Sequence, residues 1–244
     1  MPITDTPPAA PHQPAGTHQA AVLFDVDGTL VDSSYIHALA WWQAFRQAGY
    51  DVPMASIHRS VGMGGDRILD RLLPEHRDKG GDADIMTSHA AVFSTFWPSL
   101  RRLDGARELL AQCFDSGLAV ALASSARDRD LEMLRATIDA DAYIHAATSS
   151  ADAKESKPAP DILVAALHAV GVPAANAVYV GDAVWDIYAA GKLDIPAIGL
   201  TCGGTSEAEL REAGAVEVYE SPRALLENLA GSAIGRLAAR VHGG

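Results

Sequence analysis

Cysteine is scarce in this sequence, with only Cys113 and Cys202 among 244 residues. Two isolated cysteines supply neither a disulfide framework nor the paired spacing of a zinc site. Hydrophobic residues make up 48% of the chain, which at this length is enough for a sizeable apolar core. The sequence therefore predicts a globular protein of the reducing cytoplasm.

Positively charged residues and long apolar runs are also scarce in this sequence. The 19 Lys and Arg residues are outnumbered by 31 Asp and Glu, giving a net charge of −12, which argues against nucleic acid and anionic membranes as partners. No apolar run approaches the roughly 20 residues of a membrane span, and the N-terminus lacks the basic region and apolar core of a signal peptide. We expect no nucleic acid or membrane partner, a cytoplasmic location, and a monomer or a homodimer.

The chain divides by composition and pattern into four parts. Residues 1–19 are rich in proline and poor in bulky apolar side chains, which predicts a disordered tail. Residues 233–244 are expected to be frayed. Residues 33–102 carry a helical pattern throughout, whereas residues 20–32 and 103–232 together alternate strands with helices. This organisation predicts an α/β core with an inserted helical domain.

Within the helical part, apolar residues recur at helical spacing over residues 35–48, 67–73 and 83–97. A glycine-rich loop, Val61–Gly65, lies between the first two of these segments. Its glycines either let the backbone approach another part of the molecule closely or form a plain turn between helices. No strand pattern occurs, so an all-helical domain is predicted here.

Short apolar runs in the core predict six strands, over residues 21–24, 118–123, 142–148, 177–180, 196–200 and 216–219. Helical segments between them imply a parallel, Rossmann-like sheet with helices on both faces. In such sheets ligands bind at the carboxyl ends of the strands. The functional site is therefore expected at that edge.

Polar residues follow three of these strands at their carboxyl ends. Asp25 and Asp27 follow the first, Ser124 follows the second strand and Asp182 the fourth. Neighbouring carboxylates repel unless a cation lies between them or one holds a proton. The pair therefore suits a Mg²⁺ site, or a nucleophile beside a general acid/base. The alternative, a solvated pair of acids after a strand, does not account for the polar residues at the other two strand ends.

Four segments in order resemble the haloacid dehalogenase-like hydrolase superfamily: DVDGTLVD from Asp25, LASS ending at Ser125, KPAPD from Lys157, and VGDAVWD containing Asp182 and Asp186. The resemblance covers about residues 20–230. The helical insert resembles the mobile cap of the subgroup that includes phosphoglycolate phosphatases and β-phosphoglucomutases.

The resemblance implies a reaction at phosphorus. Asp25 is the expected nucleophile and forms an aspartyl-phosphate. Asp27 is expected to protonate the leaving alkoxide and then to activate a water molecule. Mg²⁺ is the expected cofactor, held by the carboxylates of Asp25 and Asp182 and the main-chain carbonyl of Asp27. Asp186 is expected to bind the metal directly or to lie next to it.

The resemblance also implies a binding site for the substrate. Ser124 and nearby amides, including that of Ser125, are expected to hold the phosphoryl oxygens, and Lys157 to neutralise the charge shared by the nucleophile and the phosphate. Gly64 and Gly65 in the cap loop are the expected contacts for the rest of the substrate. His37, on the first cap helix, is either a functional group or a residue of an amphipathic helix.

The expected function is Mg²⁺-dependent hydrolysis of a small phosphorylated metabolite, of the phosphoglycolate or sugar phosphate type. One alternative is a phosphosugar mutase, although those mutases carry an acidic residue where Gly181 stands. A dehalogenase would lack Asp27, and a phosphonatase would need a cap lysine, for which only Lys79 is available. The remaining alternative is a non-catalytic binding or regulatory module on the same fold.

Overall fold

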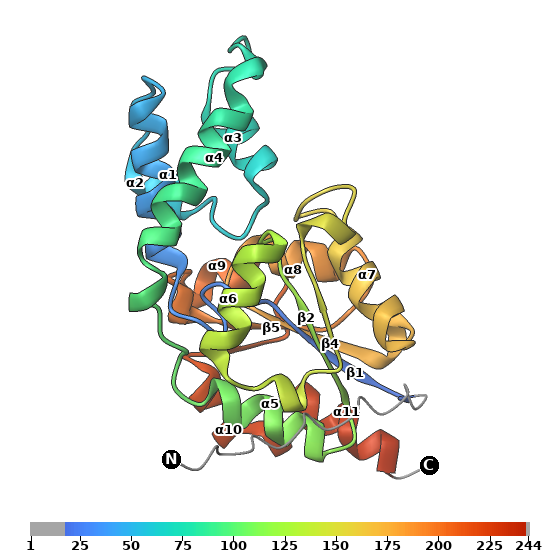
Figure 1. Ribbon diagram of the computed structural model, residues 1–244. Coiled ribbons are helices and arrows are strands. Elements are labelled where there is room, and N and C mark those ends of the chain that lie inside the picture. The colour runs from blue at the N-terminus through green and yellow to red at the C-terminus, as the bar shows by residue number, and fades with distance from the viewer. Residues whose placement is uncertain (1–17, 243–244) are drawn as a thin grey trace, which may run out of the picture.

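The computed structural model describes residues 18–242, and a six-stranded sheet forms its centre (Figure 1). The strand order is β3-β2-β1-β4-β5-β6, and every neighbouring pair is parallel. The chain order reverses beside β1, where ligands bind in folds of this kind. The predicted α/β fold is confirmed, with strands β1 (Ala21–Phe24), β2 (Ala119–Ala123), β3 (Ala146–Thr148), β4 (Ala177–Gly181), β5 (Ala197–Leu200) and β6 (Glu217–Tyr219).

Helices cover both faces of this sheet. Successive side chains of β1 point to opposite faces, so Val22 and Phe24 join one apolar cluster and Ala21 and Leu23 the other. The first cluster lies under α5 (Ala106–Asp115), α6 (Asp128–Ile138), α10 (Pro222–Glu227) and α11 (Ala233–His242). The second lies under α7 (Asp161–Val170), α8 (Val184–Gly191) and α9 (Glu207–Glu212).

The C-terminal segment differs from its prediction. The expectation was that residues 233–244 fray, but residues 233–242 form helix α11, so it is wrong for that stretch, and residues 243–244 lie outside the described residues. Ile234 and Leu237 lie on one face of this helix and are 1% and 2% exposed in the first apolar cluster. Burial of that face holds the helix on the sheet. The predicted disordered tail, residues 1–19, lies outside the described residues apart from His18 and Gln19.

The helical insert forms a cap beyond the carboxyl edge of the sheet (Figure 1). It has an apolar core of its own, which includes Trp41, Phe45, Ile57 and Leu69. The short helix α2 was not predicted, because five residues are too few to show helical periodicity. The cap comprises α1 (Ser34–Gln47), α2 (Met54–His58), α3 (Gly65–Leu72) and α4 (Asp82–Thr95).

Two extended segments join the cap to the core, and they lie side by side. Val31 and Arg102 form an antiparallel bridge. The Asp32 N–H donates to the Arg101 carbonyl, and the Leu103 N–H donates to the Leu30 carbonyl, each at 2.9 Å. The two segments that connect the core to the cap are therefore hydrogen-bonded to each other a few residues beyond the end of β1.

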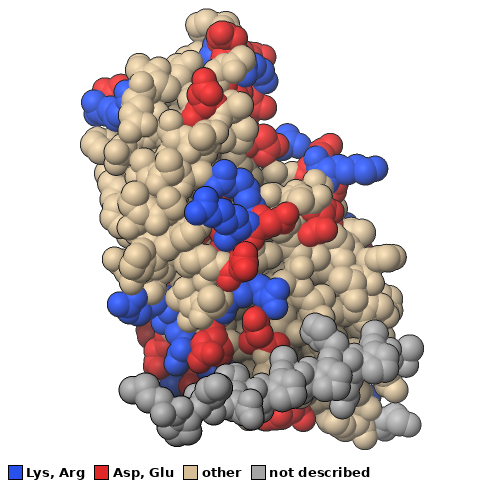
Figure 2. Space-filling model, viewed as in Figure 1, with Lys and Arg blue, Asp and Glu red and all other residues tan. Residues whose placement is uncertain are grey.

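The surface mixes charges of both signs. On the face shown in Figure 2, the Lys and Arg side chains of the described residues alternate with Asp and Glu and form no continuous basic area. Among residues 18–242, no helix combines the length and the apolar character that crossing a bilayer requires.

Candidate active site

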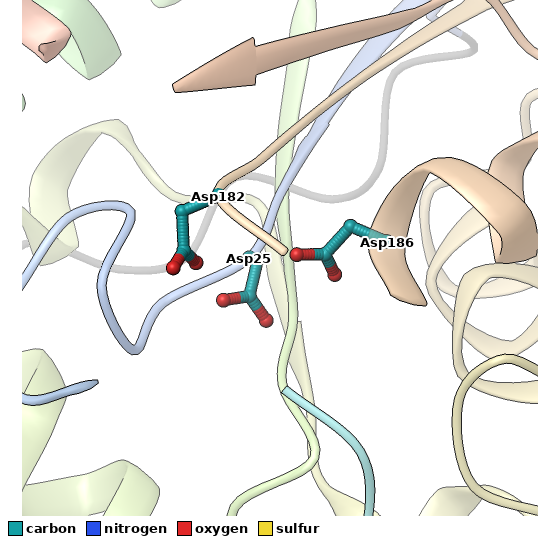
Figure 3. A group of neighbouring side chains, drawn as sticks. All are labelled: Asp25, Asp182 and Asp186. Atoms are coloured by element: carbon teal, nitrogen blue, oxygen red, sulfur yellow. The ribbon is translucent and has the colours of Figure 1, made fainter. Parts of the chain in front are cut away.

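Three carboxylates meet at the carboxyl edge of the sheet, between β1 and β4. The Asp25 N–H still donates to the Val180 carbonyl at 2.9 Å, which fixes this residue just past the end of β1. Asp182 directly follows β4, and Asp186 lies in the first turn of α8. Their side chains are buried, and each offers an oxygen within 4.8 Å of the others (Figure 3). The predicted meeting of these residues at one edge is therefore present.

Lys157 lies between two of these carboxylates. Its fully buried Nζ is 2.6 Å from Asp25 Oδ1 and 2.8 Å from Asp186 Oδ1. Asp186 also accepts hydrogen bonds from the Tyr179 hydroxyl at 2.9 Å and from the Ala183 N–H at 3.1 Å. Both oxygens of Asp186 thus have protein partners, and one of them holds Lys157 beside Asp25.

The three carboxylates together carry more negative charge than Lys157 offsets. Burial, together with Asp186 and Asp27, raises the pKa of Asp25 to about 7, because Lys157 is shared and only partly offsets it. Burial, with Asp186 and Asp25 nearby, also raises the pKa of Asp182 well above its usual range. A divalent cation would relieve this excess of negative charge. The all-oxygen donor set fits Mg²⁺.

Glycines bring the backbone close to Asp182. Gly28 has φ +79°, and a Cβ there would lie 2.5 Å from Asp182 Oδ2. A Cβ at Gly203 would collide with the same carboxylate. Thr29 Oγ1 donates to Asp182 Oδ1 at 3.1 Å. The Gly-Thr pair after Asp27 therefore turns the chain and also holds Asp182.

Asp27 lies apart from the three carboxylates and faces the cap. Its Oδ1 accepts a hydrogen bond from Ser33 Oγ at 2.6 Å and lies 3.0 Å from His37 Nε2. Burial alone would raise the pKa of Asp27, but His37 and Ser33 outweigh it and lower the pKa. The side chain of Asp27 is therefore held by the first cap helix and the residue before it, away from the group of three carboxylates.

A second histidine extends this arrangement into the cap. His89 Nε2 on α4 lies 3.2 Å from His37 Nδ1, and its ring stacks on Trp41 at 4.1 Å between centroids. Burial lowers the pKa of His89 well below its usual value, which favours the neutral ring. Sequence reasoning missed His89, because a histidine four residues before the buried Phe93 has the pattern of a helix core.

A cavity of about 340 Å³ joins these groups. Asp25, Asp27 and Ser125 line it from the core, and the glycine loop with Gly64 and Gly65 lines it from the cap. Ser124 is fully buried behind this lining, and its Oγ accepts a hydrogen bond from the Ala126 N–H at 3.0 Å. Lys79 pairs with Asp70 at 3.0 Å on the cap surface and is not among the lining residues.

A larger hollow of about 740 Å³ opens on the other side of Asp182, between Tyr35 of α1 and Trp185 of α8. Neither Asp25 nor Asp27 contributes to its lining. The carboxylates of Asp25 and Asp27 therefore face the smaller cavity.

Direct contacts close the cap over the smaller cavity. Ser156 Oγ donates to Asp66 Oδ1 at 2.7 Å, and Arg67 pairs with Glu155 at 2.6 Å. A Cβ at Gly64 would collide with the Ser156 side chain. The glycine loop was expected either to let the backbone approach another part of the molecule closely or to form a plain turn. At Gly64 the close approach is found, against Ser156.

Known proteins resemble this chain in sequence and in fold. A family model described as haloacid dehalogenase-like hydrolase matches residues 22–200. The chain is 31% identical over 202 residues to "Protein SUPPRESSOR OF QUENCHING 1, chloroplastic" of Arabidopsis thaliana, an alignment that covers 80% of this chain but only 19% of that protein. It is 26% identical over 211 residues to a phosphoglycolate phosphatase of Pseudomonas fluorescens, covering 84% and 78% of the two chains.

A solved structure has the same fold over nearly its whole length. The crystal structure of a hydrolase from Pseudomonas syringae superposes with a TM-score of 0.83 at 31% identity, covering 87% of this chain and 99% of that one. The family model matches well over half of the sequence and includes Asp25, Asp27, Ser124, Lys157 and Asp182. This chain belongs to the haloacid dehalogenase-like hydrolase family.

Proposed function

We propose that this protein is a Mg²⁺-dependent phosphatase that hydrolyses a small phosphorylated metabolite through an aspartyl-phosphate on Asp25. The observation that carries the proposal is the buried carboxylate of Asp25, held by Lys157 and placed beside Asp182 at the floor of a cavity that the cap covers. The phosphatases among its relatives support the same class of reaction.

In the first step, a carboxylate oxygen of Asp25 attacks phosphorus and the ester P–O bond breaks. Asp27 gives its proton to the departing alkoxide. In the second step, Asp27 takes a proton from water, whose oxygen attacks the phosphorus of the aspartyl-phosphate. Inorganic phosphate leaves and Asp25 is regenerated as a carboxylate.

Other residues of the site have supporting roles. Lys157 neutralises charge on Asp25 and the phosphoryl group. The resemblance assigns the phosphoryl oxygens to Ser124 and the Ser125 amide; of these two residues only Ser125 lines the cavity, with Ser124 buried behind it. Mg²⁺ bound by Asp25, Asp182 and the Asp27 carbonyl would lower the repulsion between an anionic nucleophile and an anionic phosphate. The cap loop, with Gly64 and Gly65, excludes water and contacts the alcohol part of the substrate.

One glycine supports a phosphatase over a phosphosugar mutase. A Cβ at Gly181 would lie 2.5 Å from the Asp186 carboxylate, which holds Lys157. The acidic side chain that the resemblance associates with mutases at this position would collide with that carboxylate. The two cysteines are free thiols, in keeping with a cytoplasmic enzyme.

The test is phosphate release from a panel of phosphate monoesters, measured with Mg²⁺ and with EDTA. Glucose 1-phosphate is also followed for isomerisation. We expect Mg²⁺-dependent release that Asp25→Asn abolishes and that Asp115→Asn, an exposed acid at the end of α5, leaves unchanged. Release that ignores chelation, or an Asp25→Asn variant within a few-fold of the parent, would refute the proposal.

A further inference from the structure

The wall that the cap contributes to the smaller cavity is mostly apolar. Trp41 of α1, Met63 of the glycine loop and Met86 of α4 line it, together with Val61 and Ile68. Trp41 is only 4% exposed, and the two methionines are half-buried. Little of this wall therefore faces open solvent, and a molecule in the cavity would contact it.

Gly65 shows that Trp41 and Met86 meet beside the cavity. A Cβ at Gly65, which itself lines the cavity, would lie 3.2 Å from Met86 Sδ and 3.2 Å from Trp41 Cη2. The Trp41 ring also stacks on His89, with 4.1 Å between centroids. The absence of a side chain at Gly65 therefore leaves room for two large apolar side chains at the surface of the cavity.

The cap brings no positive charge to this wall. Among the described residues of the cap, no Lys or Arg lines the cavity, and Asp66 lines it as an acid whose Oδ1 accepts a hydrogen bond from Ser156. Arg127 lines the cavity from the core, but its Nε and Nη2 donate to Asp130 Oδ2 at 3.1 and 3.0 Å. A second anionic group on a substrate would thus meet two acids and an arginine that is already paired.

We propose that Trp41, Met63 and Met86 determine specificity, and that they select a phosphate monoester whose leaving alcohol is uncharged and apolar. This inference rests on the proposed phosphatase function, in which phosphorus lies against Asp25 and the leaving oxygen against Asp27. The body of the alcohol then lies in the rest of the cavity, against the apolar wall, where burial of its C–H groups favours binding.

Other leaving groups lose more than they gain in this position. A carboxylate or a second phosphate would lose its hydration without a cation to compensate its charge. Hydroxyl groups that face the apolar wall would lose hydrogen bonds to water and find no partner there. The wall therefore disfavours both phosphoglycolate and a polyol phosphate.

The experiment compares kcat/KM for three alkyl esters in the presence of Mg²⁺, with p-nitrophenyl phosphate as the reference substrate. Isobutyl phosphate is close in size to phosphoglycolate, with two methyl groups in place of the two carboxylate oxygens. Glycerol 3-phosphate instead adds hydroxyl groups. We expect the parent to favour isobutyl phosphate over both other alkyl esters by about tenfold or more, because only its leaving group is uncharged and apolar.

Two variants and a control separate a specificity role from a structural one. Met86→Lys places a cation in the apolar wall and should raise kcat/KM for phosphoglycolate, relative to isobutyl phosphate, by about tenfold. Met63→Lys tests the same wall from the glycine loop and decides the question if Met86→Lys does not fold. Met54→Lys is the matched control, because Met54 is 42% exposed on the cap and lines the larger hollow instead; it should leave the ratio unchanged.

The outcomes distinguish this inference from the function on which it rests. A parent that does not favour isobutyl phosphate overturns the inference. So does a phosphoglycolate-to-isobutyl ratio that stays the same in the folded Met86 and Met63 variants, including one that is unchanged while activity falls on every ester. In each of these cases Mg²⁺-dependent release from p-nitrophenyl phosphate would leave the phosphatase function standing. Absence of release from all four esters by the parent refutes that function, and the inference falls with it.

Discussion

The ammonium of Lys157 lies 2.6 Å from Asp25 Oδ1, and both side chains are buried beneath the cavity. Burial opposes charge on Lys157, but the carboxylates of Asp186 and Asp25 outweigh it and raise the pKa of this lysine. Lys157 therefore remains positively charged between Asp25 and Asp186 in the interior of the protein.

Replacing Lys157 by methionine keeps the length of the side chain and removes its charge. We expect Lys157→Met to destabilise the metal-free protein by about 3 to 5 kcal/mol, because it leaves buried carboxylates uncompensated. Turnover should also be lost. The free energy of unfolding is measured by urea titration in EDTA.

The same variant provides an internal control. Adding Asp186→Asn to Lys157→Met removes one uncompensated carboxylate and should recover part of the lost stability, without restoring turnover. If the double variant is as unstable as the sum of the two single variants, the two side chains are not coupled as described.

His37 should matter most for substrates with poor leaving groups. His37→Leu removes the contact that holds the Asp27 side chain in place at 3.0 Å, and we expect this loss of orientation to outweigh the easier protonation of Asp27, so that kcat/KM for an alkyl phosphate falls by about ten- to a hundredfold. The loss on p-nitrophenyl phosphate should be smaller, because its leaving group needs little protonation. His168→Leu, at an exposed position of α7, is the matched control. Equal losses on both substrates would contradict a role through Asp27.

The stability of the metal-free protein should depend on pH through Asp25. Its pKa is raised to about 7, so near pH 5 to 6 the folded state binds a proton that the unfolded chain releases. Stability in EDTA should therefore rise as the pH falls from about 8 to about 5, and the raised pKa of Asp182 acts in the same direction. Asp25→Asn should show a shallower rise, measured as the midpoint of urea unfolding. An identical pH profile in parent and variant would exclude this assignment.

Mg²⁺ should stabilise the fold through the same carboxylates. At a concentration 100-fold above its dissociation constant, a ligand adds about 2.7 kcal/mol to the free energy of unfolding. We expect Mg²⁺ to raise the Tm of the parent and to have little effect on Asp182→Asn. In EDTA the Asp182→Asn variant should be at least as stable as the parent, because it relieves repulsion among buried acids. A Mg²⁺ shift retained in Asp182→Asn would place the metal elsewhere.

Local sequence patterns were sufficient to predict the strands of the sheet and the carboxylates that follow β1 and β4. β1 and β4 are short apolar runs followed at once by acids, so the pattern of each run located both the strand and the carboxylate at its end. The parallel topology then placed Asp25 beside Asp182. The motif around Lys157 predicted a functional lysine, although its contact with Asp186 required the folded structure.

The residues that the cap brings to the site are positioned by packing between segments that lie far apart in the sequence. His89 reaches His37 only because α4 packs against α1, and nothing in its local sequence distinguishes it from a core residue. Helix α11 was missed for a similar reason, since its two buried apolar positions become meaningful only against the sheet.

The paired segments that carry the cap have a consequence for the proton on Asp27. Ser33 and His37, which stabilise the carboxylate of Asp27, both lie a few residues beyond the bridge between Val31 and Arg102. Rotation of α1 away from the core would withdraw His37 from Asp27 and let the pKa of that acid rise. An open cap would then load Asp27 with a proton from solvent, and closure would favour its release. The cap would thus set the timing of proton transfer as well as shield the cavity.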